Sequence, residues 1–326
     1  MAATGETEDH EMTEPRTHRT EHRITVDAPT DVVFALIEDV TGWPETFPPC
    51  VHVDAERDGD RERIRIWATA GGEVKGWTSL RELDRERLRV RFRQEVSAPP
   101  VAAMGGEWVI GTDPAGATLV RLLHDFRAIG DDPAKEQWIR QAVDRNSAQE
   151  LAALRAAAEL RTRRSELTLT FSDSLRVAGA AKDVYDFIDR ADAWEQRLPH
   201  VSRVALTEET PRQQVLEMDT RTADGSTHTT RSVRICFPHD RIVYKQLRTP
   251  ALMSAHTGEW LILEAEGGTE ITSTHTVVLN PEAITDVLGA EAGVTEARTF
   301  VREALGRNST ATMGYAKAYA EGIAGR

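Results

Sequence analysis

The sequence predicts an α+β protein built from two tandem domains, each a curved antiparallel sheet wrapped around a long C-terminal helix. Three observations predict it. The chain has 326 residues, a length typical of about two domains. One order of strand-like and helix-like segments occurs twice along it, and each occurrence ends in a long amphipathic segment. We therefore treat the chain as two copies of one plan.

The two copies are related by a nearly constant shift along the chain. Paired residues lie 151 or 152 positions apart: Trp43 and Trp194, Pro48 and Pro199, Trp108 and Trp260, and His124 and His275. A shared shift over so many residues makes chance agreement improbable. The repeat therefore indicates two domains of the same fold.

The repeat also sets the expected domain boundaries. Residues 1–20 are polar and rich in acids and threonines, which predicts a disordered tail. We expect the N-terminal domain over residues 21–160, a linker over 161–171 and the C-terminal domain over 172–326. The alternating part of the linker could extend the second sheet.

Each copy opens with a short strand, a turn and a helix. In the first copy the strand covers residues 21–26, and the helix begins near Val32 with Thr30 or Asp31 as its N-cap. In the second copy the strand covers residues 174–177 and a similar helix follows. The same opening in both copies supports a common fold.

Six alternating runs with short breaks follow in each copy and predict an antiparallel meander. The runs of the first copy are about 51–57, 61–69, 73–83, 87–96, 103–112 and 117–128. The runs of the second copy are about 201–208, 212–220, 226–236, 241–248, 255–264 and 269–278.

Long amphipathic helices are expected at about residues 133–160 and 294–322, where apolar residues recur at helical spacing. Both contain an Arg-Asn-Ser triplet, at 145–147 and 307–309. A curved sheet closed by one helix encloses space. A pocket results wherever inward side chains do not fill that space.

Composition excludes several classes of function. A formal net charge of -13 argues against nucleic-acid binding and against binding to an anionic membrane, because both need basic patches. No apolar run approaches the ~18 residues of a membrane span, and the first residues lack a signal-peptide core. Cys50 and Cys236 lie far apart, which predicts a reducing compartment and a cytoplasmic protein. No phosphate loop, dinucleotide fingerprint or metal cluster is present in the sequence, so we expect no cofactor and no metal.

The segment Trp77-Thr78-Ser79-Leu80-Arg81 lies in an expected strand, where side chains alternate between faces. Trp77, Ser79 and Arg81 therefore share one face, as do Ser232 and Arg234 in the second copy. One alternative is an outward face, since arginine is mostly exposed. The repetition of the pattern favours a pocket wall with a few placed polar groups.

The order of elements resembles the helix-grip fold of START and birch-pollen-allergen-like proteins. Three features are similar to bacterial aromatase/cyclases of type II aromatic polyketide biosynthesis: Gly-Trp-Pro-Glu-Thr-Phe at 42–47, Trp-x-Ser-x-Arg at 77–81, and the Arg-Asn pair in the last helix. The doubled arrangement resembles the didomain members of that family. The likeness covers residues 20–322.

This resemblance implies roles for the strand residues. In the single-domain relatives a Trp, a Ser and an Arg of this strand line the pocket, and the Arg is implicated in cyclisation. Those roles fall on Trp77, Ser79 and Arg81. Two departures are visible, because Thr230 replaces the Trp in the second copy and Cys50 stands where single-domain relatives have a pocket Tyr.

The resemblance further implies a function: first-ring cyclisation and dehydrative aromatisation of a ketoreduced poly-β-ketone. The implied partners are an acyl carrier protein with its tethered polyketide and the other type II polyketide synthase components. Arg81 and Arg234 are suited to stabilising enolate or oxyanion charge. Ser79 and Ser232 could relay a proton or bond a carbonyl.

Histidines and tryptophans complete the candidate site. His124 and His275 could serve as the acid or base for water loss, or could be structural histidines held by hydrogen bonds. Weaker candidates without counterparts in the first copy are His228, His256 and Asp240. Five tryptophans are expected to be core residues and aromatic walls of the substrate pocket: Trp43, Trp77, Trp108, Trp194 and Trp260.

Two other functions remain open at this point. The protein could be a non-catalytic START-like carrier for a lipid or polyketide. Alternatively, one copy could be catalytic and the other a structural partner, with Trp77 favouring the first copy. The sequence does not predict chain length, regiochemistry or oligomeric state.

Overall fold

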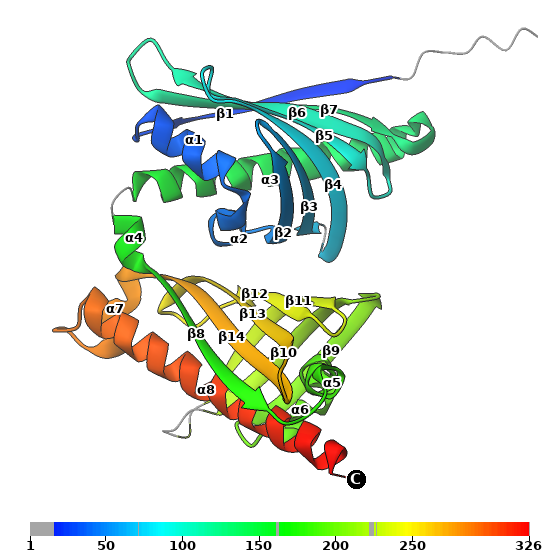
Figure 1. Cartoon of the computed structure of the whole chain (residues 1–326). Helices are drawn as coiled ribbons and strands as arrows, with labels where there is room; N and C mark the ends of the chain where they lie inside the picture. Colours follow the sequence, from blue (N-terminus) through cyan, green and yellow to red (C-terminus); the bar gives the residue numbers. More distant parts are fainter. Residues whose placement is uncertain (1–15, 71, 161–162, 222–224, 226, 326) are drawn as a thin grey trace, which may run out of the picture.

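The computed structural model describes residues 16–70, 72–160, 163–221, 225 and 227–325. Figure 1 shows two sheets, one in each half of the chain, and a long helix running along each sheet. Of the expected tail, residues 1–15 lie outside the described part. No described helix is long and apolar enough to cross a lipid bilayer.

The N-terminal domain contains one sheet and three α-helices in the described chain. In chain order the elements are β1 (His18–Val26), α1 (Thr30–Glu38), α2 (Trp43–Thr46), β2 (Cys50–Asp58), β3 (Arg61–Ala70), β4 (Glu73–Asp84), β5 (Arg89–Val96), β6 (Val101–Thr112), β7 (Thr118–Ala128) and α3 (Pro133–Glu159). The sheet is antiparallel in the order β1-β7-β6-β5-β4-β3-β2.

The C-terminal domain repeats this plan. Its elements are α4 (Arg163–Leu167), β8 (Thr168–Val177), α5 (Ala181–Asp189), α6 (Trp194–Arg197), β9 (Val201–Thr210), β10 (Gln213–Arg221), β11 (Thr227–Phe237), β12 (Arg241–Arg248), β13 (Met253–Ala265), β14 (Gly268–Leu279), α7 (Ile284–Leu288) and α8 (Val294–Ala324). The sheet order is β8-β14-β13-β12-β11-β10-β9. Two seven-stranded antiparallel sheets with long C-terminal helices confirm the predicted fold class.

Two local expectations were wrong. β1 begins at His18, where its backbone already pairs with Phe126 of β7, so residues 18–20 belong to the sheet and not to the expected tail. The N-cap of α1 is Pro29 and no side chain caps this helix, so neither Thr30 nor Asp31 has that role. In the expected linker, the described residues form α4 and the start of β8.

The extended start of β8 follows from pairing with β14. Hydroxyl pairs link the exposed faces of these strands: Thr170 with Thr276 at 3.1 Å, Ser172 with Thr274 at 2.9 Å and Ser174 with Thr272 at 2.8 Å. Cross-strand hydroxyl pairs of this kind stabilise antiparallel sheets. The alternating part of the linker therefore extends the second sheet, as one reading of the sequence allowed.

The long helices close the sheets without filling them. α3 starts with Pro133 in its first turn, and the Asp132 carboxylate accepts a hydrogen bond from the Ala134 amide at 2.9 Å. On the buried face of α8 most side chains are small: Ala297, Gly306, Ser309, Thr312, Ala316 and Ala320. Because short side chains do not reach the opposite sheet, space remains inside the C-terminal domain.

A buried guanidinium fastens the first helix of each domain to the sheet. Arg81 is 1% exposed and donates to the Ile37 carbonyl at 2.7 Å and to the Glu38 carbonyl at 3.3 Å, at the end of α1. Arg234 donates to the matching carbonyls of α5, Ile188 at 2.6 Å and Asp189 at 3.4 Å. A helix C-terminus has unpaired carbonyls and a partial negative charge, so it accepts a cation well.

The two guanidiniums differ in one partner. Arg81 also donates to the Glu62 carboxylate of β3 at 2.7 Å, and this forms a buried ion pair. At the matching place on β10, Arg234 donates to the neutral Gln214 amide oxygen at 2.7 Å. One domain thus compensates its buried cation with a carboxylate, and the other with an uncharged group.

The domains contact each other through an apolar cluster and a buried lysine. The cluster joins Val51 and Trp67 of the first domain to Val233, Ile235 and Val243 of the second. An edge-to-face contact between the rings of Trp67 and Phe237, 5.6 Å apart, extends it.

Lys245 of β12 is 5% exposed and points its ammonium at the neighbouring domain. It donates to the carbonyls of Phe47, Pro48 and Cys50 at 2.9, 2.9 and 2.8 Å. Burial lowers the pKa of Lys245 to about 8, so it remains cationic at neutral pH. The C-terminal domain therefore holds the segment that follows α2.

Replacing Lys245 with Met should weaken the contact between the domains. Three buried carbonyls would lose a charged donor, and we expect a loss of about 2–4 kcal/mol in interface stability. Hydrogen exchange of the interface amides and limited proteolysis would measure it. Lys182→Met, which removes an exposed helix-surface pair with Asp186, is the control and should cause no measurable change. Equal protection in both variants would contradict the proposed role of Lys245.

Replacing Arg81 with Met should cost more than replacing Arg234. The first change leaves the buried Glu62 carboxylate with Arg57, at 3.8 Å, as its one ion-pair partner among the described residues. Because Arg57 offsets part of the cost, we expect a loss of stability near the lower end of about 3–5 kcal/mol. The second leaves a neutral amide, and we expect about 1–3 kcal/mol. Hydrogen exchange of β4 and β11 amides would report each domain separately, since two domains need not unfold in one step.

The double variant Arg81→Met with Glu62→Gln is the matched control. It should return the cost in the N-terminal domain to that of Arg234→Met. Equal losses for the two single variants would mean that the Glu62 charge contributes nothing to stability.

Candidate functional site

The N-terminal domain encloses a cavity of about 130 Å³ between the inner face of its sheet and α3, here called the N-terminal cavity. The structure places every candidate of the first copy in its lining: Trp43, Trp77, Ser79, Arg81, Trp108 and His124. Alternation along β4 puts Ser79 and Arg81 inward, while Leu80 between them is 46% exposed. The strand face is therefore a cavity wall and not an outward surface.

Arg81 is held in this wall from several sides. Its terminal nitrogens donate to α1 and to Glu62, and the Trp43 ring lies 5.0 Å from the guanidinium carbon. Burial lowers the pKa of Arg81 to about 10, partly offset by Glu62, so the group is still cationic at neutral pH. Among the described residues none accepts a hydrogen bond from its Nε. Arg81 is thus a rigid positive wall group whose position is determined by its neighbours.

His124 of β7 faces the same cavity. Its ring meets Phe92 edge-on at 5.6 Å, and its buried Nδ1 has no hydrogen-bond partner among the described residues. Burial lowers the pKa of His124 to about 4. The imidazole is therefore neutral at physiological pH, and no described residue occupies its Nδ1.

Glu150 of α3 is a cavity residue that the sequence analysis missed. It is half-buried and lines the cavity, and no described residue donates a hydrogen bond or forms an ion pair with its carboxyl group. Desolvation raises the pKa of Glu150 to about 7. Helical spacing in the sequence could have identified it. Glu150 lies next to the buried Leu151 and three positions after the buried Ser147, on the inward stripe of α3.

Cys50 lies in the lining, where the single-domain relatives were expected to have a Tyr. Burial raises the pKa of the Cys50 thiol to about 12, so it stays protonated. Cys50 is therefore a small apolar wall residue and not a nucleophile. Its carbonyl is one of the three that Lys245 binds, so the second domain holds this part of the wall.

The C-terminal domain encloses a matching space of about 130 Å³, here called the C-terminal cavity. The main candidates of the second copy all line it: Trp194, Ser232, Arg234, Trp260 and His275. Other polar lining groups are His200, His228, Tyr244, His256 and Asn308. Thr230, in the position that Trp77 has in the first domain, also contributes to this wall.

A chain of hydrogen bonds runs through the wall of the C-terminal cavity. Nδ1 of His275 lies 3.0 Å from the Tyr244 hydroxyl and 3.0 Å from Nε2 of His256, and its Nε2 lies 3.3 Å from Ser273 Oγ. Burial lowers the pKa of His275 to about 4 and that of His256 to about 3, and raises the pKa of Tyr244. His275 is thus a hydrogen-bonded neutral histidine, unlike His124.

Asp240 and two recurring glutamates lie outside the linings of both cavities. Asp240 forms an ion pair with Arg241 at 3.8 Å and is exposed. Glu107 and Glu259, which recur in the two copies, pair with arginines on the sheet surface. Among the described residues, no group of three His, Cys, Asp or Glu side chains is placed to hold a metal ion.

Comparisons with known proteins agree with this architecture. A family model described as "Polyketide cyclase / dehydrase and lipid transport" matches residues 17–159, and a second model with the same description matches residues 177–301. The chain is 48% identical over 304 residues to the granaticin polyketide synthase bifunctional cyclase/dehydratase of Streptomyces violaceoruber, covering 93% of this chain and 94% of that protein. It is 47% identical over 320 residues to the actinorhodin polyketide synthase bifunctional cyclase/dehydratase of Streptomyces coelicolor, covering 95% and 99%.

A solved structure is similar over almost the whole chain. The crystal structure of the di-domain ARO/CYC BexL from the BE-7585A biosynthetic pathway is 57% identical and superimposes with a TM-score of 0.84, covering 93% of this chain and 99% of that one. The chain therefore belongs to the polyketide cyclase and dehydrase family, and it carries two tandem domains of that family.

Proposed function

We propose that the protein closes and aromatises the first ring of a ketoreduced poly-β-ketone while the chain is bound to an acyl carrier protein. The observation that carries this proposal is the N-terminal cavity, where Arg81, His124 and Glu150 face one aromatic-walled space. An acid, a base and a fixed cation are the groups that aldol-type closure and dehydration need. The two free buried thiols, Cys50 and Cys236, fit a cytoplasmic site of action.

The proposed chemistry uses protons that the substrate itself supplies. A methylene between two ketones is acidic, and the neutral His124 nitrogen takes one of its protons. The resulting enolate carbon attacks a second carbonyl, and the new alkoxide receives a proton from the Glu150 carboxyl group. In the dehydration step the Glu150 carboxylate takes a further α-proton, and the protonated His124 gives its proton to the hydroxyl, which leaves as water. Both groups then return to their starting protonation states.

Arg81 contributes a positive charge at a fixed position in this scheme. Its position does not change during the reaction, since carbonyls and Glu62 hold both terminal nitrogens. A fixed cation stabilises developing oxyanion charge without reorganisation. The tryptophan walls exclude water and restrict the conformations of a flexible chain. We expect most of the rate enhancement to come from these two effects.

Cavity size indicates how a long chain would bind. The N-terminal cavity of about 130 Å³ is comparable to the engineered cavity of about 150 Å³ that takes benzene, so it holds one ring. A much larger interdomain cleft of about 820 Å³ lies beside it, and Trp77 lines both spaces. We propose that the rest of the chain and the carrier's prosthetic arm occupy this interdomain cleft.

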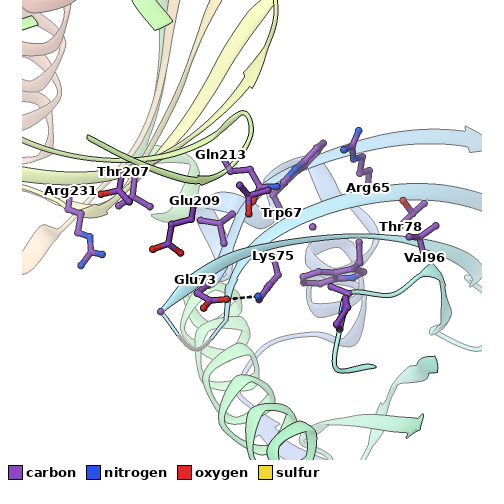
Figure 2. Close-up of a pocket in the computed structure, with 18 of the residues that line it drawn as sticks. Arg65, Trp67, Glu73, Lys75, Thr78, Val96, Thr207, Glu209, Gln213 and Arg231 are labelled. Atoms are coloured by element: carbon purple, nitrogen blue, oxygen red, sulfur yellow. Dashed lines mark ion pairs between the residues drawn. The ribbon is translucent and has the colours of Figure 1, made fainter. Parts of the chain in front are cut away.

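The charge of the interdomain cleft favours an acidic carrier. Figure 2 shows Arg65, Glu73 and Lys75 on one side of the cleft and Glu209 and Arg231 on the other. Glu73 pairs with Lys75, whereas Arg65, Arg231 and Glu209 have no ion-pair partner among the described residues. Two unpaired arginines against one unpaired carboxylate leave a small positive excess in the cleft, although the chain as a whole carries -13.

A non-catalytic carrier for a lipid or polyketide is the second candidate, and the apolar walls favour it. The carrier hypothesis, however, gives no role to the Glu150 carboxyl group, which has no partner among the described residues. Reconstitution with a minimal polyketide synthase and a ketoreductase separates the two. An enzyme changes the ring pattern of the products, whereas a carrier changes only their yield or solubility.

Activity should depend on pH through Glu150. The carboxyl group must be protonated to act as the acid, and burial raises its pKa to about 7, so kcat/KM should fall as pH rises above about 7. In Glu150→Gln this upper limb should disappear and kcat should drop by about 100-fold. Steady-state kinetics with a carrier-bound substrate from pH 5 to 9 would measure both.

Glu159→Gln is the matched control, because Glu159 lies on the same helix outside the cavity lining and accepts a hydrogen bond from the Asp27 amide. It should keep the wild-type pH profile. If Glu150→Gln retains both the rate and the upper limb, the assignment of the acid is wrong.

Reversing charge in the interdomain cleft should weaken carrier binding. We expect Arg65→Glu with Arg231→Glu to raise KM for carrier-bound substrate at least fivefold at low salt, with kcat little changed. A small thioester mimic without the carrier should show no such change. Arg61→Glu, an exposed arginine outside the cleft, is the control. An unchanged KM would place the carrier elsewhere.

A further inference from the structure

The C-terminal cavity differs from the N-terminal one in charge, although the two have the same volume. No described residue of its lining is an aspartate or glutamate, whereas the N-terminal cavity is lined by Glu150. Its guanidinium, Arg234, is 2% exposed and contacts the neutral Gln214 where Arg81 contacts a carboxylate. The same buried cation is therefore left with less compensation in the second domain.

The nearest carboxylates do not reach the Arg234 guanidinium. Asp189 and Glu208 accept hydrogen bonds from the Gln214 amide nitrogen, at 3.3 and 3.1 Å, and that amide stands between them and the arginine. The other partners of Arg234 are the carbonyls at the end of α5. The guanidinium is thus hydrogen-bonded to uncharged groups, and no described carboxylate forms an ion pair with it.

The histidines of the C-terminal cavity do not alter this balance at neutral pH. Burial lowers the pKa of each of the four lining histidines, so all stay uncharged: His200, His228, His256 and His275. Burial likewise raises the pKa of the Tyr244 hydroxyl, which keeps its proton. The lining therefore carries one positive charge, with hydroxyl and imidazole groups beside it that can hydrogen-bond a ligand.

We propose that the C-terminal cavity binds an anionic ring, namely the ionised form of a cyclic 1,3-diketone or of the phenol derived from it. A buried cation without a carboxylate partner gains most from an anion that enters its cavity, since the low-dielectric surroundings strengthen the attraction. The volume of about 130 Å³ fits one ring. Trp194, whose ring lies 5.3 Å from the Arg234 guanidinium carbon, and Trp260 supply flat walls for that ring.

This inference deepens the proposed function by giving the second domain a ligand class: the acidic ring that the first domain would produce. The N-terminal cavity, whose arginine is cationic but already ion-paired with Glu62, suits the uncharged open chain. The two cavities would then prefer different charge states of the same carbon skeleton. Glu62 and Gln214, which occupy matching places, set the difference.

Binding of a small probe to the full-length protein tests the proposal. The probe is 5,5-dimethylcyclohexane-1,3-dione, which is ionised at neutral pH, and the control ligand is its neutral enol methyl ether. Calorimetric titration should show the anion binding at least tenfold more tightly than the ether. Equal affinities for the two ligands would overturn the proposal.

Two exchanges at the matching positions locate the site. Gln214→Glu copies the Glu62–Arg81 pair that the chain already contains, and it should weaken anion binding at least tenfold while leaving the ether unchanged. Glu62→Gln should create a second anion site in the N-terminal cavity. Thermal melting would check that both variants are folded. Anion affinity that is unaffected by Gln214→Glu would place the probe elsewhere and refute the assignment.

Failure of this inference is distinguishable from failure of the proposed function. The binding assay involves no turnover, and the Glu150→Gln kinetics involve no probe. Loss of anion selectivity with an intact pH profile would refute only the role of the second domain. Anion selectivity without any effect of the protein on ring pattern would refute only the catalytic assignment.

Discussion

A buried arginine is the constraint on which each domain depends. A guanidinium cannot be taken out of water unless acceptors surround it, and here the carbonyls that end the first helix supply most of them. This requirement ties that helix to the inner face of the sheet in both domains. The same contacts hold the cation rigidly in the cavity wall, so stability and a preorganised positive site have one origin.

Around this shared constraint the two domains have diverged in their polar groups. The N-terminal cavity contains the His124 imidazole and the Glu150 carboxyl group, with pKa values of about 4 and about 7, and neither has a hydrogen-bond partner among the described residues. The C-terminal cavity contains a connected chain through His256, His275 and Tyr244. Free acid and base groups suit proton transfer, whereas a connected neutral chain suits orienting a ligand.

The interface makes the two domains one working unit. Lys245 of the second domain binds three carbonyls of the segment that forms a wall of the first cavity. Residues of both domains also line the interdomain cleft beside that cavity. A change in one domain can therefore alter the shape of the other's site without touching the substrate, which is a physical reason for keeping both copies in one chain.

Local sequence patterns determined the order of elements, the repeat, the inward face of β4 and the aromatic walls, because strand alternation and helical spacing depend only on nearby residues. They also placed Arg81 and Arg234 correctly at cavity walls. Only the tertiary structure decided the partners of these arginines. Strand register places Glu62 opposite Arg81 and Gln214 opposite Arg234, and helix packing brings the helix carbonyls to both. The environment of Glu150 and the contacts of Lys245 were likewise decided in three dimensions, because desolvation and long-range hydrogen bonds have no local signature.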